Sequence, residues 1–208
     1  MGGAAATTGH RALTAADGSS GLELQTGRLT LRELSADDFE AVHLYASDPE
    51  VVAYVPWGPN TEHDTRTFLE QNAQSAMARP RLDHVLGIVP AGQDRLVGTV
   101  GLYVSPDDQG QAMLGYVLSR TAWGQGYATE AAAAMLELGF LVLDLRRIWA
   151  ACDPDNRGSI RVLEKIGMTR EGRLRDDTVI RGRVRDTLRW GILEREWHTG
   201  TLPERSRE

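Results

Sequence analysis

The stretch that decides the fold is Leu118-Ser-Arg-Thr-Ala-Trp-Gly-Gln-Gly-Tyr-Ala-Thr-Glu130. It follows a run of residues typical of a β-strand and passes through Gly124 and Gly126 into a helix that we expect to begin at about Tyr127. The first backbone N–H groups of a helix have no partner within the helix, and glycines let an anion approach them closely. The stretch therefore predicts a pyrophosphate site, although a simple turn explains the same two glycines.

The segments on either side of this loop predict alternating strands and helices. Before it, the capping boxes Ser35-Ala-Asp-Asp38 and Thr61-Glu-His-Asp64 predict helices that end near residues 46 and 78. Runs rich in Val, Leu, Ile and Tyr predict one strand near residues 29–31 and an antiparallel meander at residues 84–89, 96–104 and 112–118. After the loop, we expect a helix to residue 143, a strand at 148–152, a helix at 159–166, and strands at 169–175 and 184–193.

The length and composition predict one soluble domain. The chain has 208 residues, of which 41% are hydrophobic and 25% charged, as is usual for a globular protein. We expect flexible tails at residues 1–24 and 199–208 around a domain at residues 25–198. No apolar run is long enough for a membrane helix and no signal peptide is evident, so a cytoplasmic location without a membrane partner is expected.

The charge is unevenly distributed along the chain. Residues 1–156 hold 10 arginines against 20 acidic residues, whereas residues 157–195 hold 11 basic residues against 6 acidic ones. The net charge of −6 argues against nucleic acid as a partner, because such binding depends on cations that neutralise phosphates. The basic segment is instead suited to a small anion.

Several other chemistries lack their residues. A dinucleotide-binding loop needs a third glycine where Thr129 stands, and a phosphate-binding P-loop needs a lysine, whereas the only lysine is Lys165. No zinc-hydrolase or serine-hydrolase motif is present, and we expect no metal site. The single cysteine, Cys152, cannot form a disulfide within the chain.

Four motifs together resemble one known superfamily. They are Arg28-Leu-Thr-Leu-Arg-Glu33, Trp123-Gly-Gln-Gly-Tyr-Ala-Thr-Glu130, Asp153-Pro-Asp-Asn156 and Ser159-Ile-Arg-Val-Leu-Glu-Lys-Ile-Gly-Met168. Their order resembles the GNAT superfamily of acyl-CoA-dependent N-acyltransferases, and within it the branch of ribosomal-protein alanine and serine N-acetyltransferases, from about Leu24 to Trp197. The resemblance implies a mixed α+β fold. Its central sheet is twisted and mostly antiparallel, with about six to seven strands, and it is splayed between the fourth and fifth strands. About four helices accompany the sheet.

The resemblance also implies the cosubstrate and the residues that bind it. The cosubstrate is acetyl-CoA, and its pyrophosphate lies on the backbone of a glycine loop that maps to Gly124, Gln125, Gly126, Tyr127, Ala128 and Thr129. The pantetheine arm lies beside Val117, Leu118 and Ser119, where a main-chain N–H can polarise the thioester carbonyl. Asn156 and Ser159 face the pantetheine and the sulfur, although the same two residues are equally explained as the N-cap and first turn of a helix.

The chain departs from the superfamily at positions that matter for catalysis. Met113 occupies the place of a glutamate that commonly acts as general base, and Leu163 that of a tyrosine that protonates the departing thiolate. Ser159 is then the remaining candidate for the catalytic acid. Thr121 replaces a long polar side chain, and Thr178 a carboxylate that some relatives carry.

These departures favour direct transfer to an amine that is already neutral near working pH. An N-terminal α-amine, with a pKa near 7.7–8.0, meets this condition better than a lysine side chain. Acyl transfer through Cys152 is the alternative, and a small core side chain is the simpler explanation of that cysteine. Tyr54 and Trp57 are candidate acceptor-binding residues, because the resemblance places the acceptor side near their loop.

Three functions remain open from the sequence. The first is an N-acetyltransferase for a protein N-terminal α-amine. The second is an acyltransferase for a small amine such as an amino acid, a polyamine or an antibiotic, and the third is a CoA-binding sensor without turnover. A homodimer that shares the last strand is compatible with each of them.

Overall fold

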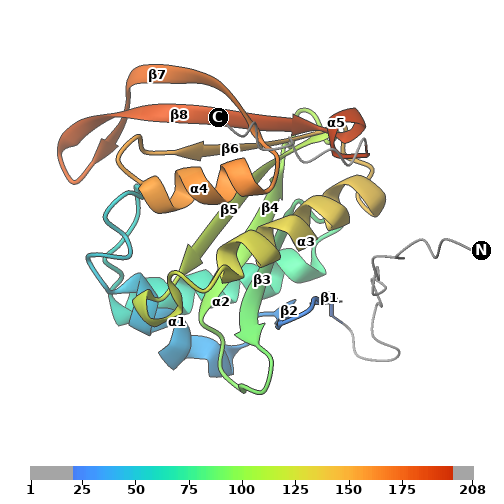
Figure 1. Ribbon diagram of the computed structural model, residues 1–208. Helices are drawn as coiled ribbons and strands as arrows, with labels where there is room; N and C mark the ends of the chain where they lie inside the picture. The colour runs from blue at the N-terminus through green and yellow to red at the C-terminus, as the bar shows by residue number, and fades with distance from the viewer. Residues whose placement is uncertain (1–20, 199–208) are drawn as a thin grey trace, which may run out of the picture.

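The computed structural model describes residues 21–198 and shows a single sheet with helices on both faces (Figure 1). The strands are β1 (Glu23–Gln25), β2 (Leu29–Glu33), β3 (Asp83–Pro90), β4 (Gly98–Val104), β5 (Gln111–Leu118), β6 (Arg147–Cys152), β7 (Thr169–Ile180) and β8 (Arg183–Leu193). The helices are α1 (Phe39–Ala46), α2 (Glu62–Met77), α3 (Tyr127–Leu141), α4 (Arg157–Lys165) and α5 (Glu194–His198). Residues 1–20 and 199–208, on which the predicted tails largely fall, lie outside the described residues.

The expected α+β fold is confirmed, with one strand and one helix more than the sequence predicts within the described residues. The additional strand is β1, which pairs with β2 and includes Glu23 and Leu24 from the predicted N-terminal tail. The additional helix is α5, which has five residues. Both are too short to give a periodic signal in the sequence.

The sheet has the order β1-β2-β3-β4-β5-β6-β8-β7, and all adjacent strands are antiparallel except β5 and β6. These two strands pair at three levels, of which Met113 with Trp149 is the last. Beyond that level β5 continues to Leu118 and β6 to Cys152, and the two strands no longer pair with each other. The predicted splay therefore opens at Met113 and Trp149, between β5 and β6, which are the fourth and fifth of the strands predicted from the sequence.

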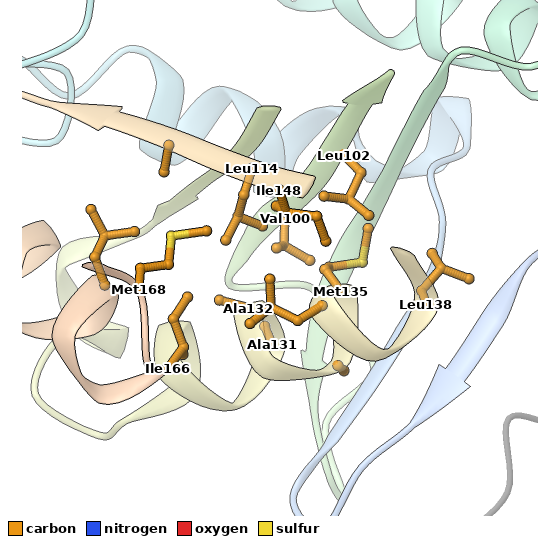
Figure 2. Packing of buried hydrophobic residues seen from close by; sticks show 14 of the residues in the cluster. Val100, Leu102, Leu114, Ala131, Ala132, Met135, Leu138, Ile148, Ile166 and Met168 are labelled. Carbon is orange, nitrogen blue, oxygen red and sulfur yellow. The ribbon is translucent and has the colours of Figure 1, made fainter. Parts of the chain in front are cut away.

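Two hydrophobic clusters hold the helices against the two faces of the sheet. On one face, α3 buries Ala131, Ala132, Met135 and Leu138 against β4, β5 and β6 (Figure 2). The contact is close, because a Cβ at Gly139 would lie 2.6 Å from Ile148 Cδ1. On the other face, α1 and α2 pack on β3 and β4 around a second cluster.

Local signals explain where these helices begin. Thr61 and Asp64 form the predicted capping box of α2, since the Thr61 N–H donates to the Asp64 carboxylate at 2.9 Å and the Asp64 N–H donates to Thr61 Oγ1 at 3.2 Å. Gly167 ends the α4 segment with a φ of +83°, as predicted for a C-terminal cap. None of the helices within residues 21–198 is both long and apolar enough to cross a membrane.

Candidate active site

The glycine loop between β5 and α3 presents a row of free backbone N–H groups. Gly124 and Gly126 have φ angles of +75° and +79°, and Gly126 is the N-cap of α3. Along α3, Glu130 is the first residue whose N–H has an acceptor within the loop and helix, and it donates to the Gly126 carbonyl at 3.1 Å. A Cβ at Gly124 would meet nothing within 4 Å. The backbone of the predicted pyrophosphate site is thus open, and it lies at the positive end of a helix of 15 residues.

Arg28 brings a guanidinium beside this loop, with its charge paired to a carboxylate. Its guanidinium forms an ion pair with Glu130 at 2.7 Å, donates to the Gln125 carbonyl at 2.9 Å, and lies 5.2 Å from the centre of the Tyr127 ring. These contacts connect the start of β2 to the start of α3. Arg28 and Glu130 belong to two separate sequence motifs. The sequence does not indicate that they meet, because 102 positions separate them.

The edge of β5 that faces the splay carries free backbone N–H groups, whereas the Leu118 carbonyl on this edge accepts from Trp123 Nε1 at 2.9 Å. Backbone groups of successive residues point to opposite sides of a strand, and the Ser119 N–H donates to the Val97 carbonyl at 2.8 Å. The amides of Val117 and Ser119 therefore face β4, whereas those of Tyr116 and Leu118 face the splay. Of the three predicted residues on this strand, Leu118 is the one whose N–H points into the opening.

Ser159 lies in the first turn of α4, where its hydroxyl meets a tyrosine from β5. The Tyr116 hydroxyl is 2.9 Å from Ser159 Oγ and 3.2 Å from the Ser159 carbonyl oxygen. Burial raises the pKa of Tyr116, and its hydrogen bond to Ser159 partly offsets this effect. Asn156 is the N-cap of α4 and accepts from the Ser159 N–H at 3.0 Å. The structure thus places Tyr116, which the sequence analysis missed, in contact with the candidate acid.

A cavity of about 990 Å³ extends from the splay along the α1 and α2 face of the sheet. Tyr54, Trp57, Val117, Asn156 and Ser159 all line it. The predicted acceptor residues and part of the predicted CoA-binding set therefore share one continuous space.

The loop that carries Tyr54 and Trp57 is fastened by the β7–β8 hairpin. The Arg181 guanidinium donates to the carbonyl oxygens of Val52, Trp57 and Gly58 at 2.8, 3.1 and 3.1 Å. Arg181 has a φ of +49° at the turn of the hairpin. This loop, the predicted acceptor loop, is thus held by a residue more than 120 positions away in the chain.

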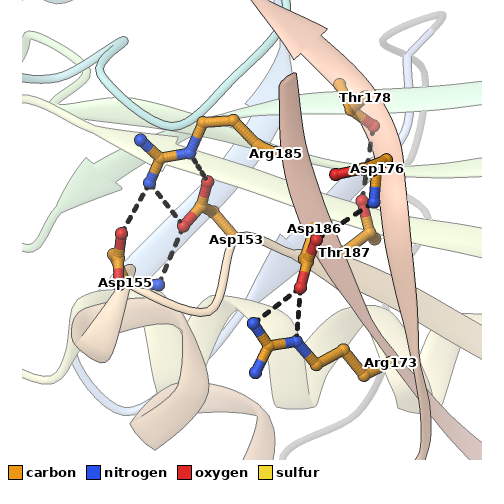
Figure 3. Close-up of polar contacts among 8 residues, drawn as sticks. All are labelled: Asp153, Asp155, Arg173, Asp176, Thr178, Arg185, Asp186 and Thr187. Atoms are coloured by element: carbon orange, nitrogen blue, oxygen red, sulfur yellow. Dashed lines mark hydrogen bonds and ion pairs between the residues drawn. The ribbon is translucent and has the colours of Figure 1, made fainter. Parts of the chain in front are cut away.

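Two arginines of the basic segment form ion pairs, one with the end of β6 and one within the β7–β8 hairpin (Figure 3). Arg185 bridges Asp153 and Asp155, with nitrogen to oxygen distances of 2.5 and 2.8 Å, and its guanidinium lies 5.7 Å from the centre of the Tyr54 ring. Arg173 pairs with Asp186 at 2.6 Å. These arginines are therefore held by carboxylates of the same chain.

The position of the missing glutamate lies in a row of residues that crosses the sheet at one level. Asp83, Tyr103, Met113 and Trp149 are successive cross-strand partners on β3, β4, β5 and β6. Met113 thus stands at the apex of the splay, and the carboxylate in its row, Asp83, is two strands away. Burial, with a smaller effect of the Asp83 charge, raises the pKa of Tyr103.

The predicted position Thr178 and the two residues before it lie where the pairing of β7 is irregular. Thr178, where some relatives carry a carboxylate, lies with its hydroxyl 3.3 Å from that of Thr187. Asp177 is exposed at the rim of the cavity, whereas Asp176, with a φ of +51°, donates its N–H to Asp186 at 3.0 Å. The strand has a register shift between Leu174 and Thr178 at this point.

Cys152 is buried at the end of β6 and belongs to the core under α3 and α4. Burial raises the pKa of its thiol. A thiol that stays protonated is a poor nucleophile. The geometry therefore supports a packing role for this side chain.

Comparison with known proteins agrees with this geometry. The family model described as "Acetyltransferase (GNAT) domain" matches residues 28–169. An uncharacterised N-acetyltransferase of Bacillus subtilis (strain 168), YnaD, is 35% identical over 178 residues, which cover 85% of this chain and all of YnaD. The crystal structure of a GNAT-family acetyltransferase from Bacillus anthracis superposes with a TM-score of 0.75 at 34% identity, over 84% of this chain and 99% of that one.

A spermidine N-acetyltransferase from Vibrio cholerae, solved in complex with CoA and spermine, shares the fold. It has a TM-score of 0.72 at 21% identity, over 83% of this chain and 99% of that one. The motifs, the splayed sheet, the family model and the relatives agree with one another. The chain belongs to the GNAT family of acetyltransferases.

Proposed function

We propose that this N-acetyltransferase binds acetyl-CoA with its pyrophosphate on the backbone of Gly124 to Thr129 and its pantetheine arm in the splay. The free amides at the start of α3 and the adjacent Arg28 guanidinium support the first contact. The N–H groups of Tyr116 and Leu118, which face the splay, support the second, because an amide-bearing arm can pair with them as a strand would. Acetyl-CoA supplies the acetyl thioester.

The acceptor in this proposal is a primary amine that reacts in its own neutral form. The observation that carries this proposal is the absence of a carboxylate at Met113, since the acid in the same row, Asp83, is displaced by two strands or roughly 10 Å. An α-amine with a pKa near 7.7–8.0 is substantially neutral near pH 7.5. Such an amine needs only water to carry away its proton. A protein N-terminal α-amine is therefore the first candidate.

A small amine is the second candidate, and the cavity supports it. Its volume of about 990 Å³ falls at the upper end of the range usual for small-molecule sites. An amino acid, a polyamine and an amine-bearing antibiotic all belong to this class.

The chain's own groups would act on either side of the reacting carbonyl. The amine nitrogen forms a bond to the carbonyl carbon, the carbon–sulfur bond breaks, and the thiolate takes up a proton. The Leu118 N–H faces the splay and would stabilise negative charge on the carbonyl oxygen. The Ser159 hydroxyl, hydrogen-bonded to Tyr116, would give its proton to the sulfur and take one from Tyr116, which water would reprotonate with the proton released by the amine nitrogen.

The test is release of the CoA thiol from acetyl-CoA in the presence of a panel of peptides and small amines. The proposal expects release with at least one acceptor and an acetylated amine as product. Tight binding of acetyl-CoA with no release from any acceptor would contradict it and would favour a CoA-binding sensor.

A further inference from the structure

One arginine in the cavity differs from the other arginines of residues 21–198. Arg189, on β8, is partly buried and lines the cavity, yet it has no hydrogen-bonded or ion-paired partner among the residues that the structure describes. The other partly buried arginines of this part of the chain are all ion-paired, and those without a partner are all exposed. A guanidinium has five N–H donors, and leaving them unsatisfied in a half-buried position is costly.

The surroundings of Arg189 leave its donors open to the cavity. The residues directly opposite it on the adjacent strands are Ala151 on β6 and Gly172 on β7. Neither can hydrogen-bond to the guanidinium through a side chain. The one side-chain contact described for the group is with Trp149, whose ring centre lies 4.5 Å from Arg189 Cζ. Stacking on an indole fixes the plane of a guanidinium and leaves its edge free for a planar anion.

The position of this group relates it to the reacting amine. Trp149 forms the last pair between β5 and β6, so the Arg189 guanidinium lies beside the apex of the splay. Arg189 lies on the same face as Trp149 and the cavity, opposite the face covered by α3. The cavity is lined by Arg189 and by none of residues 124–129 of the glycine loop, so an anion held by Arg189 would belong to the acceptor.

We propose that Arg189 binds a carboxylate of the acceptor, close to the amine that is acetylated. This inference rests on the proposed function and narrows its substrate class to acceptors that carry both groups, of which a free α-amino acid is the simplest. A carboxylate presents two oxygens to the two N–H groups of a guanidinium edge. Pairing also removes the influence by which a free carboxylate raises the pKa of a neighbouring amine, and the arginine charge itself disfavours the ammonium form. Arg189 would therefore both hold the acceptor and help to keep its amine neutral.

The experiment compares matched acceptors with the full-length protein and acetyl-CoA, by release of the CoA thiol. The acceptors are free amino acids, the corresponding amino acid amides, and C-terminally amidated peptides that begin with Glu or Gln. The enzymes are the wild type, Arg189→Gln, and the control Arg183→Gln, which removes an exposed arginine at the far end of the same strand. The glutamate peptides distinguish a side-chain carboxylate from the α-carboxylate of a free amino acid.

We expect the wild type to have a kcat/KM about ten- to hundredfold higher for carboxylate-bearing acceptors than for their amide partners, as is typical of one charge-assisted bidentate contact. The difference in amine pKa works against this preference, because the amides have the lower amine pKa and therefore more of the reactive neutral form. Arg189→Gln should remove this preference, mainly through KM, and leave the amides almost unchanged. Arg183→Gln should behave as the wild type. An equal loss for both kinds of acceptor in Arg189→Gln, or amides that match the acids in the wild type, would overturn the inference.

A binding measurement keeps this test separate from the test of catalysis. The melting temperature is measured with CoA and each amino acid, because a bound ligand stabilises the native state. Stabilisation of the wild type but not of Arg189→Gln supports the carboxylate site even if no acceptor releases thiol, an outcome that would contradict only the proposed turnover. No stabilisation of the wild type by any acid, together with no preference for acids in turnover, would overturn the site itself.

Discussion

Gly124 and Gly92 provide a matched pair that isolates the role of the glycine loop in binding. Their φ angles are +75° and +77°, and a Cβ built on either residue meets nothing within 4 Å. Gly92 lies in the turn between β3 and β4 and does not line the cavity, and the preceding residue, Ala91, donates its N–H to the Arg28 carbonyl at 2.8 Å. Replacing either glycine by alanine should therefore cost the folded state the same left-handed backbone penalty, about 1–2 kcal/mol. For a chain of this size that cost lowers the melting temperature by about 2–8 °C.

The two substitutions should differ in their effect on acetyl-CoA. The methyl group of Gly124→Ala would stand where a phosphate oxygen reaches the free amides before α3, whereas that of Gly92→Ala faces only solvent. Loss of one charge-assisted hydrogen bond is worth about 1.5–3 kcal/mol, so the Kd of Gly124→Ala should rise about 10- to 150-fold. Titration calorimetry with acetyl-CoA measures this difference directly. Equal Kd values for the two variants would refute the assignment of the pyrophosphate to this loop.

Three further outcomes follow from contacts in the structure. Tyr116→Phe and Ser159→Ala should each lower kcat about tenfold or more, and the double variant should be no slower than the slower single one; multiplicative losses would argue against a shared proton path. Cys152→Ala should keep the rate within about threefold, and mass spectrometry after incubation with acetyl-CoA should find no acetyl group on Cys152 of the wild type, whereas an adduct would point to acyl transfer through the thiol. Burial alone raises the pKa of the Asp38 carboxyl, but hydrogen bonds, chiefly from Arg32, outweigh it and lower the pKa. The stability that this carboxylate contributes is thus fully present above about pH 4 and lost as the pH falls through the lower folded-state pKa, so the melting temperatures of the wild type and Asp38→Asn should converge in acid. A difference that stays constant with pH would contradict this role.

The parts of the fold that the sequence predicts well depend on contacts between residues close in the chain. The capping box of Thr61 and Asp64 spans three positions, and the glycine loop is fixed by the backbone angles of Gly124 and Gly126 themselves. Such signals are visible in any window of the sequence. They give the helix starts, the order of the strands along the chain and the backbone shape of the glycine loop.

The parts that the sequence does not predict depend on long-range register. The contact between Tyr116 and Ser159 spans 43 positions, and that between Arg181 and the acceptor loop more than 120. Arg189 lacks a side-chain partner on the adjacent strands because its cross-strand neighbours are Ala151 and Gly172. This arrangement is known only once the pairing of three strands is known. A run of arginines alone cannot show which of them are neutralised by carboxylates and which of the unpaired ones is partly buried in the cavity.

The pH dependence of kcat/KM with two acceptors of different amine pKa tests whether the neutral amine attacks acetyl-CoA without help from a base on the enzyme. Direct attack by the neutral amine, without an enzyme base at Met113, predicts a rate that rises with pH to an inflection at the pKa of each acceptor. The inflection should therefore move when the acceptor is changed. A single inflection at the same pH for both acceptors would instead reveal a general base on the enzyme and contradict the account.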